Sequence, residues 1–245
     1  MENPIFCIAG DTSALRHAAN KLTQWGYEIT ATPSRQATHL LLPVPSFDTD
    51  GTIKGGPRLS EILSQLQPEV TALGGNLPVL PCPSIDFLQD EYYLQENASI
   101  TARCALSRLV QTQGTLQGTQ TLVIGWGRIG KHLAVLLQKA GAEVSVAARK
   151  KTDLALIAAS GYLPVNIRNW NTRHFHVIIN TAPAPLLDQN DTQDNALLMD
   201  LASERGITGD RVIWARGLPN RDAPEESGML IAKTALRYAL GKELL

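Results

Sequence analysis

The sequence predicts an α/β protein whose 245 residues form two domains, each built around a parallel sheet. Short apolar runs alternate with segments whose apolar residues recur every three or four positions, which is typical of strands followed by crossover helices. One such unit, residues 121–149, carries a glycine-rich turn between its strand and its helix. The N-terminal alternation lacks a second turn of this kind, so only the C-terminal domain is expected to bind a dinucleotide.

Residues 1–92 are expected to form the smaller domain, a flavodoxin-like or Rossmann-like α/β layer on the substrate side. Its predicted strands are 5–9, 28–32, 39–42 and 70–73, and its predicted helices are 14–25 and 59–66. A loop rich in proline and glycine, residues 43–58, follows the third strand. Open α/β sheets bind ligands at such strand ends, but the pattern fits an ordinary surface loop equally well.

Residues 93–245 are expected to form a Rossmann domain with a doubly wound parallel sheet. A hinge helix over 94–112 leads into it, and a last helix over 226–241 can return to the first domain. The predicted strands are 121–124, 143–148, 162–165, 177–180, 196–201 and 211–215, and the predicted helices between them are 131–140 and 152–160.

The glycine-rich turn has the spacing of a dinucleotide site, Gly125-Trp126-Gly127-Arg128-Ile129-Gly130. The first glycine permits the tight turn, the second lets a pyrophosphate approach the backbone, and the third lets the helix pack close to the strand. The free N–H groups at the helix start then receive phosphate. We therefore predict that these six residues bind the cofactor.

The end of the second strand of this unit predicts which dinucleotide binds. A carboxylate there would bind the ribose 2′-hydroxyl and repel a 2′-phosphate. This chain has Ala148-Arg149-Lys150-Lys151 instead, with cations and no acid. Arg149 and Lys150 therefore predict NADP in preference to NAD, because a guanidinium can both stack on adenine and pair with phosphate.

Three later strand ends should lie in line with the glycine motif, near the nicotinamide. They are followed by Asn180-Thr181-Ala182-Pro183, by Ala202-Ser203 and by Arg216-Gly217. In a doubly wound sheet, the carboxyl ends of the strands line the ligand crevice. We therefore assign Asn180, Thr181, Ala182, Pro183, Ala202 and Gly217 to cofactor binding.

Composition excludes several other classes of function. A net charge of −1 gives no electrostatic reason to expect nucleic-acid or membrane binding. Cys7, Cys82 and Cys104 are dispersed and fit reduced thiols, and no metal-ligand spacing is present, so no metal is expected. No run approaches the ~20 apolar residues of a membrane span, and the N-terminus lacks a basic signal-peptide head. A cytoplasmic location is expected.

Several segments together resemble the A subunit of dipicolinate synthase, a family of NADP-binding Rossmann dehydrogenases, over nearly the whole chain. Beside the glycine motif, they are Gly10-Asp11, Leu42-Pro43-Val44, residues 96–102, Asn180-Thr181-Ala182-Pro183, Asp200-Leu201-Ala202-Ser203, Gly217-Leu218-Pro219 and Ala223-Pro224 with Gly228. The Asp-Leu-Ala-Ser and Gly-Leu-Pro segments are more specific than the glycine motif.

The resemblance implies NADP-dependent formation of dipicolinate, pyridine-2,6-dicarboxylate, during sporulation. The substrate would be a dihydro- or hydroxytetrahydrodipicolinate from the lysine (diaminopimelate) branch. The expected partner is a second, flavoprotein-like subunit, and the expected compartment is the mother-cell cytoplasm of a spore-former. Analogy with paired dehydrogenases, together with the apolar last helix, favours a homodimer or larger oligomer.

A dicarboxylate substrate assigns further candidate residues. Its carboxylates can be bound by arginine guanidinium groups or by hydroxyl donors. Arg205, Arg216 and Ser203 have this chemistry and follow adjacent strands. Asp11, Pro43 and Val44 would face them from the first domain. At the hinge, Asn97 is a substrate-binding candidate and Glu96 is the candidate base; Ser203 is also a catalytic candidate. Surface arginines paired with Glu204 or Asp210 are the alternative interpretation of Arg205 and Arg216.

Two other functions stay open at this point. The stretch between Ser203 and Arg211 is shorter than in the family, and Arg216 replaces a proline, so the substrate end of the site differs. The chain is therefore also compatible with an NADP-dependent dehydrogenase for a 2-hydroxy or 2-imino acid. A non-catalytic NADP-binding regulator is the third hypothesis.

Overall fold

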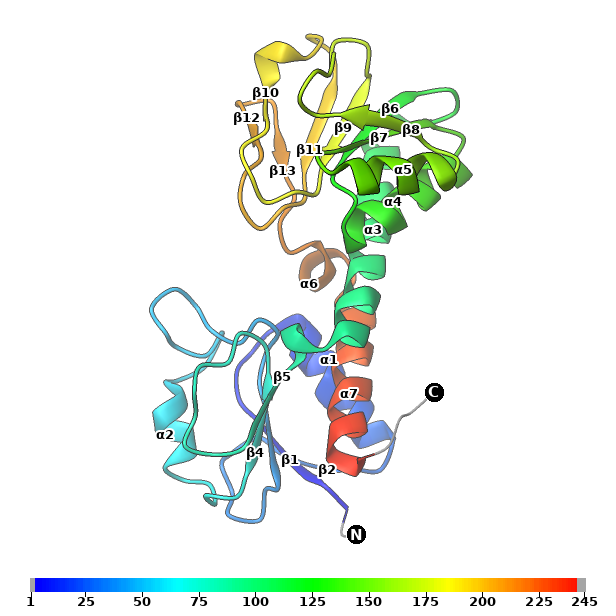
Figure 1. Ribbon diagram of the computed structural model, residues 1–245. Coiled ribbons are helices and arrows are strands. Elements are labelled where there is room, and N and C mark those ends of the chain that lie inside the picture. Colours follow the sequence, from blue (N-terminus) through cyan, green and yellow to red (C-terminus); the bar gives the residue numbers. More distant parts are fainter. Residues whose placement is uncertain (1–2, 242–245) are drawn as a thin grey trace. The chain divides into compact units, whose positions relative to one another are not determined.

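The computed structural model describes residues 3–241, which divide into two compact units (Figure 1). Residues up to Asn97 and from Pro219 onward form the first unit, and Ala98–Leu218 form the second. Each unit is built around one parallel sheet with helices packed on it, so the predicted fold class is confirmed. Helix α3 (Glu91–Gln113) contributes residues to both units.

The first unit contains a five-stranded sheet in the order β2-β1-β3-β4-β5, which is the order of flavodoxin-like folds. The strands are β1 (Ile5–Ile8), β2 (Glu28–Thr30), β3 (His39–Leu41), β4 (Thr71–Gly74) and β5 (Ser84–Asp86). Strand β5 was not predicted from the sequence, because three residues after Pro83 are too few to show an alternating pattern. The 3-10 helix η1 (Phe87–Gln89) follows β5 directly.

Helices cover both faces of this sheet. Cys7, Leu40 and Leu42 are fully buried and pack in one core with Ile62 of α2 (Leu59–Leu63). Helices α1 (Ser13–Gln24) and α7 (Pro224–Leu240) lie side by side on the other face (Figure 1). The β-branched and leucine residues of the strands thus alternate between two apolar layers, as a parallel sheet requires.

Helices α1 and α7 can approach closely because α7 carries a glycine at the crossing. A Cβ atom on Gly228 would lie 2.5 Å from the Cβ of His17 and 2.6 Å from the Ala14 carbonyl oxygen. Any side chain there would therefore push the helices apart. Helix α7 ends at Leu240 and is capped by Gly241, whose φ of +59° is a left-handed conformation that glycine adopts without strain.

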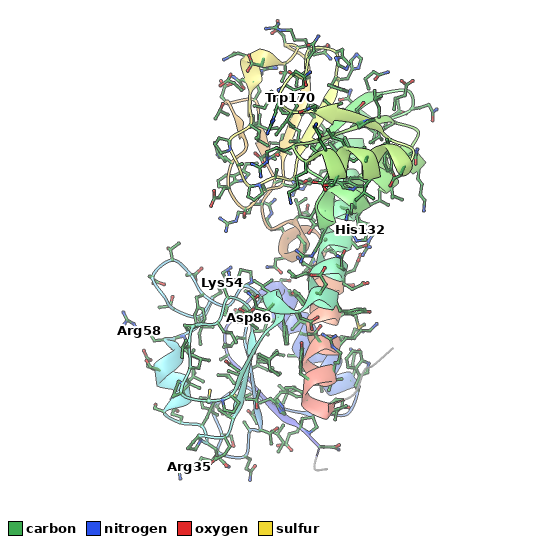
Figure 2. All side chains as sticks on the ribbon, viewed as in Figure 1. Arg35, Lys54, Arg58, Asp86, His132 and Trp170 are labelled. Atoms are coloured by element: carbon green, nitrogen blue, oxygen red, sulfur yellow. The ribbon has the colours of Figure 1, made fainter. Side chains whose placement is uncertain are left out.

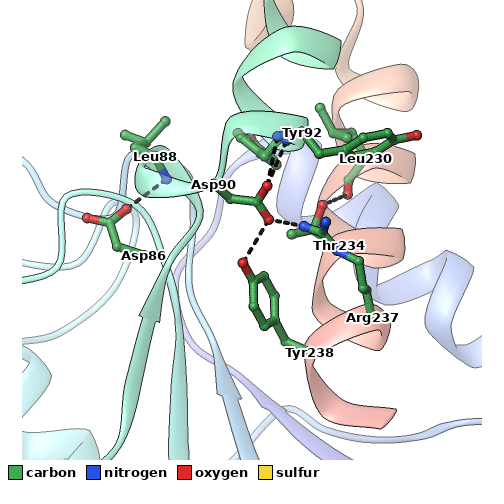
Figure 3. Close-up of polar contacts among 9 residues, drawn as sticks. Asp86, Leu88, Asp90, Tyr92, Leu230, Thr234, Arg237 and Tyr238 are labelled. Carbon is green, nitrogen blue, oxygen red and sulfur yellow. Dashed lines mark hydrogen bonds and ion pairs between the residues drawn. The ribbon is translucent and has the colours of Figure 1, made fainter. Parts of the chain in front are cut away.

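A buried carboxylate joins the start of α3 to α7 (Figure 3). Oδ1 of Asp90 accepts the N–H groups of Tyr92, at 2.9 Å, and Tyr93, at 3.2 Å, and so caps the first turn of α3. Oδ2 accepts the hydroxyl of Tyr238 at 2.9 Å and pairs with Arg237. Because the Asp90 side chain is only 5% exposed, removing either partner would leave a poorly compensated buried charge.

Loop 43–58, which carries Lys54 and Arg58 (Figure 2), follows β3 and contacts the residues that follow β1 and β4. The Asp11 N–H donates to the Lys54 carbonyl oxygen at 2.8 Å. Ser46 Oγ donates to the Pro43 carbonyl oxygen at 2.8 Å and accepts the Gly75 N–H at 3.0 Å. The loop is therefore tied to three strand ends, and a ligand-binding role for it stays a prediction.

The second unit contains a six-stranded parallel sheet in the order β13-β11-β9-β6-β7-β8. The strands are β6 (Gln120–Ile124), β7 (Glu143–Ala148), β8 (Leu163–Asn166), β9 (Val177–Asn180), β11 (Leu197–Asp200) and β13 (Ile213–Trp214). Numbered within the unit and read from β8, the order is 3-2-1-4-5-6, that of the Rossmann fold. The direction of winding reverses between β6 and β9, which makes that junction the topological switch point.

The two halves of this sheet are connected differently. Helices α4 (Arg128–Lys139) and α5 (Lys151–Ala159) link β6, β7 and β8. The later crossovers carry only the 3-10 helix η2 (Gln189–Asp191) and the short paired strands β10 (Leu187–Asp188) and β12 (Ile207–Thr208). Buried Phe175, Leu187 and Ile207 nevertheless pack with Ile178 and Leu198, so loops in place of long helices cover this part of the sheet.

The short helix α6 (Leu218–Asp222) begins at the boundary between the units. Within residues 3–241, no helix is both long enough and apolar enough to cross a membrane.

We predict that the first unit loses stability as the pH falls below about 6.5, through His39. Burial holds the pKa of His39 below its ordinary value of 6.5, so the unfolded chain binds the proton more readily. The stabilisation is present above pH 6.5 and is lost as the pH falls from 6.5 toward the folded-state pKa. His39→Phe, which keeps the contact with the Phe6 ring at 5.3 Å, should flatten this part of the urea-midpoint profile. If the urea midpoint of His39→Phe depends on pH as that of the wild type does, other groups cause the pH dependence.

Candidate functional site

The carboxyl ends of five strands of the second sheet form one row. The register pairs Ala147 with Ile124, Ile124 with Asn180, Asn180 with Asp200, and Asp200 with Trp214. The residues that directly follow this row include the glycine motif and most of the residues predicted to bind cofactor. The sheet therefore brings together segments that lie far apart in the sequence, at the edge where such folds bind ligands.

In the glycine-rich turn, a side chain on two of the three glycines would clash with neighbouring atoms. Gly125 has a φ of +104°, and a Cβ there would lie 2.6 Å from Thr181 Oγ1. A Cβ on Gly130 would overlap the Gly125 carbonyl oxygen. These contacts seat α4 directly against the end of β6.

Gly127 differs from the other two glycines of the motif. It is the N-cap residue of α4, and a Cβ built there would meet no atom within 4 Å. It is exposed, as is Arg128, while Ile129 is half-buried. Space is thus open where the first N–H groups of α4 have no helical partner, which fits a phosphate group approaching the backbone.

Trp126 extends the turn toward β8. Its ring contacts Tyr162 edge-on, with centroids 5.8 Å apart, and the Lys131 ammonium lies 5.8 Å from its centroid. Trp126 is half-buried, so its packing holds the turn in place from the β8 side. This contact of Tyr162 was not predicted from the sequence, since a single aromatic residue beside a short strand gives no specific signal.

The end of β7 presents cations. Ala147 and Ala148 are buried, whereas Arg149 and Lys150 are exposed and lead into α5. Asp153, in the first turn of α5, is the nearest acidic residue that follows in the sequence. The strand end therefore has the chemistry expected for a ribose phosphate, and the NADP assignment stays a prediction.

Asp200 and Asn180 form a buried network that the sequence analysis did not anticipate. Asp200 Oδ1 accepts Asn180 Nδ2 at 2.9 Å and the Ala202 N–H at 3.0 Å. Its Oδ2 accepts the N–H groups of Gly206, at 2.7 Å, and Ile207, at 2.9 Å. Asp200 is fully buried, and four donors compensate the cost of burying its carboxylate.

Asn180 ties the next loop into the same network. Its Oδ1 accepts the Ala182 N–H at 3.0 Å, and its Nδ2 donates to the Ala182 carbonyl oxygen at 2.9 Å. Thr181 Oγ1 donates to the Ile124 carbonyl oxygen at 2.9 Å. These side chains therefore hold the loops after β6 and β9 together, while Pro183 is exposed beyond them.

The predicted substrate residues of the second unit are exposed near this network. Ser203 follows β11, and Arg216 and Gly217 follow β13, with Gly217 at a φ of +71°. The Arg205 guanidinium lies over the Trp214 ring, 4.5 Å from its centroid. Asp210 Oδ1 accepts a hydrogen bond from Gln189 Nε2 at 2.8 Å. Within residues 3–241, Arg205 therefore stacks on an aromatic ring and forms no ion pair with Asp210.

The remaining candidates lie in the first unit. Asp11 is exposed and pairs with Arg16, while Pro43 and Val44 are buried and the Val44 carbonyl oxygen accepts Asn220 Nδ2 at 3.3 Å. Because α3 begins at Glu91, Glu96 lies in the second turn of the helix, beyond the predicted helix start; it is exposed. Asn97 is half-buried and has a polar contact of its own.

A separate depression of about 260 Å³ lies on the flank of α3 and α4, near His132 (Figure 2). Its lining residues are Ser99, Arg103, Lys131, His132, Val135 and Leu136. It includes no strand end and no glycine of the motif, so we do not assign it to dinucleotide binding.

The glycines of the turn yield a matched pair of predictions. Gly127→Ala should weaken NADP binding at least ~10-fold while leaving thermal stability nearly unchanged, because the added methyl group protrudes only into open space. Gly130→Ala should instead destabilise the protein by about 1–3 kcal/mol, because its methyl group overlaps backbone. Calorimetric titration and urea unfolding measure the two effects. If wild type and Gly127→Ala bind NADP with equal affinity, the prediction that this turn binds the phosphate is wrong.

Comparison with known proteins supports the resemblance predicted from the motifs. No family model matches the chain. The A subunit of dipicolinate synthase from Bacillus subtilis (strain 168) is 28% identical over 159 residues, which cover 60% of this chain and 54% of that protein. The match thus spans about half the length of this curated relative.

Solved structures extend the likeness to the whole chain. The crystal structure of the A subunit of dipicolinate synthase from Bacillus halodurans superposes with a TM-score of 0.83 at 22% identity, covering 98% of each chain. L-alanine dehydrogenase superposes with a TM-score of 0.64 at 13% identity, covering 97% of this chain and 80% of its own. The chain therefore has the two-domain fold of Rossmann dehydrogenases, and it is similar in sequence and in structure to the A subunit of dipicolinate synthase.

Proposed function

We propose that the protein is an NADP-dependent oxidoreductase that forms dipicolinate. The observation that carries the dinucleotide assignment is the turn at Gly125, Gly127 and Gly130. Two of these glycines are sterically required, and the third leaves open space at the N-terminus of α4 at the switch point of the sheet. An NADP molecule bound there would supply the hydride acceptor.

Arg149 and Lys150 favour the phosphorylated dinucleotide. Both are exposed at the end of β7, where an acidic residue would otherwise bind the ribose hydroxyl groups. A guanidinium can form two parallel hydrogen bonds to a phosphate, which a ribose hydroxyl cannot match. The preference for NADP over NAD therefore depends on these two cations.

The substrate assignment is supported by the similarity to the A subunit of dipicolinate synthase. Oxidation of a dihydrodipicolinate removes one hydride and one proton and leaves the aromatic pyridine-2,6-dicarboxylate, with NADP reduced to NADPH. A hydroxytetrahydrodipicolinate would first lose water. Aromatisation supplies much of the driving force, so the protein has mainly to orient the ring and accept the proton.

Several residues of this chain have the chemistry for these tasks. The guanidinium groups of Arg205 and Arg216 are exposed and suited to carboxylates. The Ser203 hydroxyl, also exposed, can donate to a carboxylate, and the Glu96 carboxylate is the candidate proton acceptor. The Asn180 and Asp200 side chains are fully engaged within the protein, so their role is to hold the loops after β9 and β11.

The wider biological setting follows from the same resemblance. We propose that the partner is a second, flavoprotein-like subunit and that the chain forms a homodimer or larger assembly. The proposed compartment is the mother-cell cytoplasm of a spore-former. The substrate would come from the lysine branch.

The cofactor preference yields one prediction. Arg149→Ala should weaken NADP binding about 10-fold more than it weakens NAD binding, because only NADP loses a charge-assisted hydrogen bond to its phosphate. Lys139→Ala removes a cation at the opposite end of α4 and serves as the control. Isothermal titration of both dinucleotides measures the effect. NAD binding to wild type as tightly as NADP would contradict the assignment.

The reaction yields another prediction. Incubation with NADP and freshly generated dihydrodipicolinate should produce NADPH, seen at 340 nm, together with the ultraviolet absorbance of dipicolinate in equal amount. Glu96→Gln should lower turnover by about two orders of magnitude, the typical contribution of a general base, without changing NADP affinity. Turnover only with simple 2-hydroxy or 2-imino acids would replace this substrate. Tight NADP binding without turnover on any of them would indicate a regulator.

A further inference from the structure

We propose that Arg205 is a pre-organised carboxylate clamp, in which Trp214 and Asp200 are the positioning residues. The inference rests on the proposed function, because it deepens the substrate end of the same strand-end site. It assigns to Trp214 and Asp200 a role in substrate selection. The ligand class is a small molecule with a carboxylate able to lie in the plane of a guanidinium group.

The backbone that follows Arg205 is held by hydrogen bonds to Asp200. Oδ2 of the fully buried Asp200 accepts the N–H groups of Gly206 and Ile207, the two residues directly after the arginine. Any side chain on Gly206 would clash with the Asn180 amide, and its Cβ would lie 2.6 Å from the Ala184 carbonyl oxygen. The loop therefore has little freedom at the point from which Arg205 extends.

The Arg205 guanidinium packs with one of its two faces on the Trp214 ring. The guanidinium carbon of Arg205 lies 4.5 Å from the centroid of the Trp214 ring, within the range of a cation–π contact. Trp214 pairs in register with Asp200, so the indole ring and the buried carboxylate belong to neighbouring positions in one row of the sheet. Stacking covers one face of the guanidinium and leaves its N–H edges available for a coplanar carboxylate.

Two acidic residues of the neighbouring segments have polar partners other than Arg205. Asp188 accepts the Thr208 hydroxyl at 2.6 Å, and Asp210 accepts Gln189 Nε2 at 2.8 Å. Glu204 precedes Arg205 and is exposed. Among residues 3–241, no hydrogen bond or ion pair is recorded for the Arg205 side chain, so its five N–H donors are unused by the fold.

Pre-organisation explains why the stack matters for binding. A free arginine side chain loses much rotamer freedom when it binds a ligand, and this loss opposes affinity. An arginine already held against an indole loses less. Trp214 should therefore contribute to carboxylate affinity without touching the carboxylate.

The test measures binding of pyridine-2,6-dicarboxylate by calorimetry, with and without NADP, and uses its dimethyl ester as the uncharged control. Arg205→Lys should lose at least ~10-fold in affinity for the dicarboxylate, because a lysine retains the charge but lacks the planar pair of N–H donors that binds both carboxylate oxygens. Trp214→Leu should lose roughly 3- to 10-fold, and Trp214→Phe should recover most of that loss, because a phenyl ring can still stack. NADP affinity should be unchanged in all three.

Two variants control for surface substitution. Arg35→Lys exchanges an exposed arginine of the first unit, and Trp25→Leu removes a tryptophan that is 40% exposed, against 39% for Trp214. Neither should alter dicarboxylate binding. Amide hydrogen exchange at Gly206 and Ile207 should speed up in Asp200→Asn and stay slow in Trp214→Leu, which separates the backbone anchor from the stack.

The outcomes distinguish this inference from the proposed function. If NADP binds to wild type but Arg205→Lys and Trp214→Leu bind the dicarboxylate as wild type does, the clamp is wrong and the dinucleotide site stands. If wild type with NADP binds no dicarboxylate, the clamp is equally wrong. If NADP fails to bind but the dicarboxylate still binds in a manner that depends on Arg205 and Trp214, the clamp stands and the redox function falls.

Discussion

The buried carboxylate of Asp200 is the constraint on which the carboxyl edge of the second sheet depends. A carboxylate without water is unstable unless hydrogen-bond donors surround it, and this one has four, from Asn180, Ala202, Gly206 and Ile207. Three of those donors are backbone N–H groups of the loop that follows β11. The charge thus fixes a loop that has no helix to hold it, and it aligns that loop with the end of β9.

This anchoring compensates for an uneven Rossmann sheet. On the side of β7 and β8, α4 buries Leu133, Ala134 and Leu137 and α5 buries Ile157, so helices pack on this part of the sheet. On the side of β9, β11 and β13, the crossovers contain only short strands and a 3-10 helix. On this side, buried hydrogen-bond networks fix the loop conformations, because a fully satisfied network specifies one conformation. On the other side, helix packing has this role. The glycine turn after β6 is therefore held by steric contacts, and the loops after β9 and β11 are held by hydrogen bonds.

The same division explains how the similarity to dipicolinate synthase relates to the proposed function. The strand order of the second sheet is that of the Rossmann fold, and this fold supports many unrelated functions. Under the proposed function, the substrate would be selected by Arg205 and Arg216 in the loops after β11 and β13, with Arg205 stacked on Trp214 at the end of β13. Differences in this short region can change the substrate while the fold and the cofactor site remain.

The sequence by itself determined the alternation of strands and helices, the glycine turn and the cations after β7, because each depends on local periodicity or on a single tight turn. It also predicted a last helix, and the structure packs that helix along α1, where Gly228 permits the close approach. Only the tertiary structure decided that Asp200 is a buried anchor, that Asn180 and Thr181 hydrogen-bond to neighbouring strand ends, and that Arg205 stacks on Trp214. Those contacts join residues from separate strands, and the register that aligns them arises from sheet pairing, which no local pattern encodes.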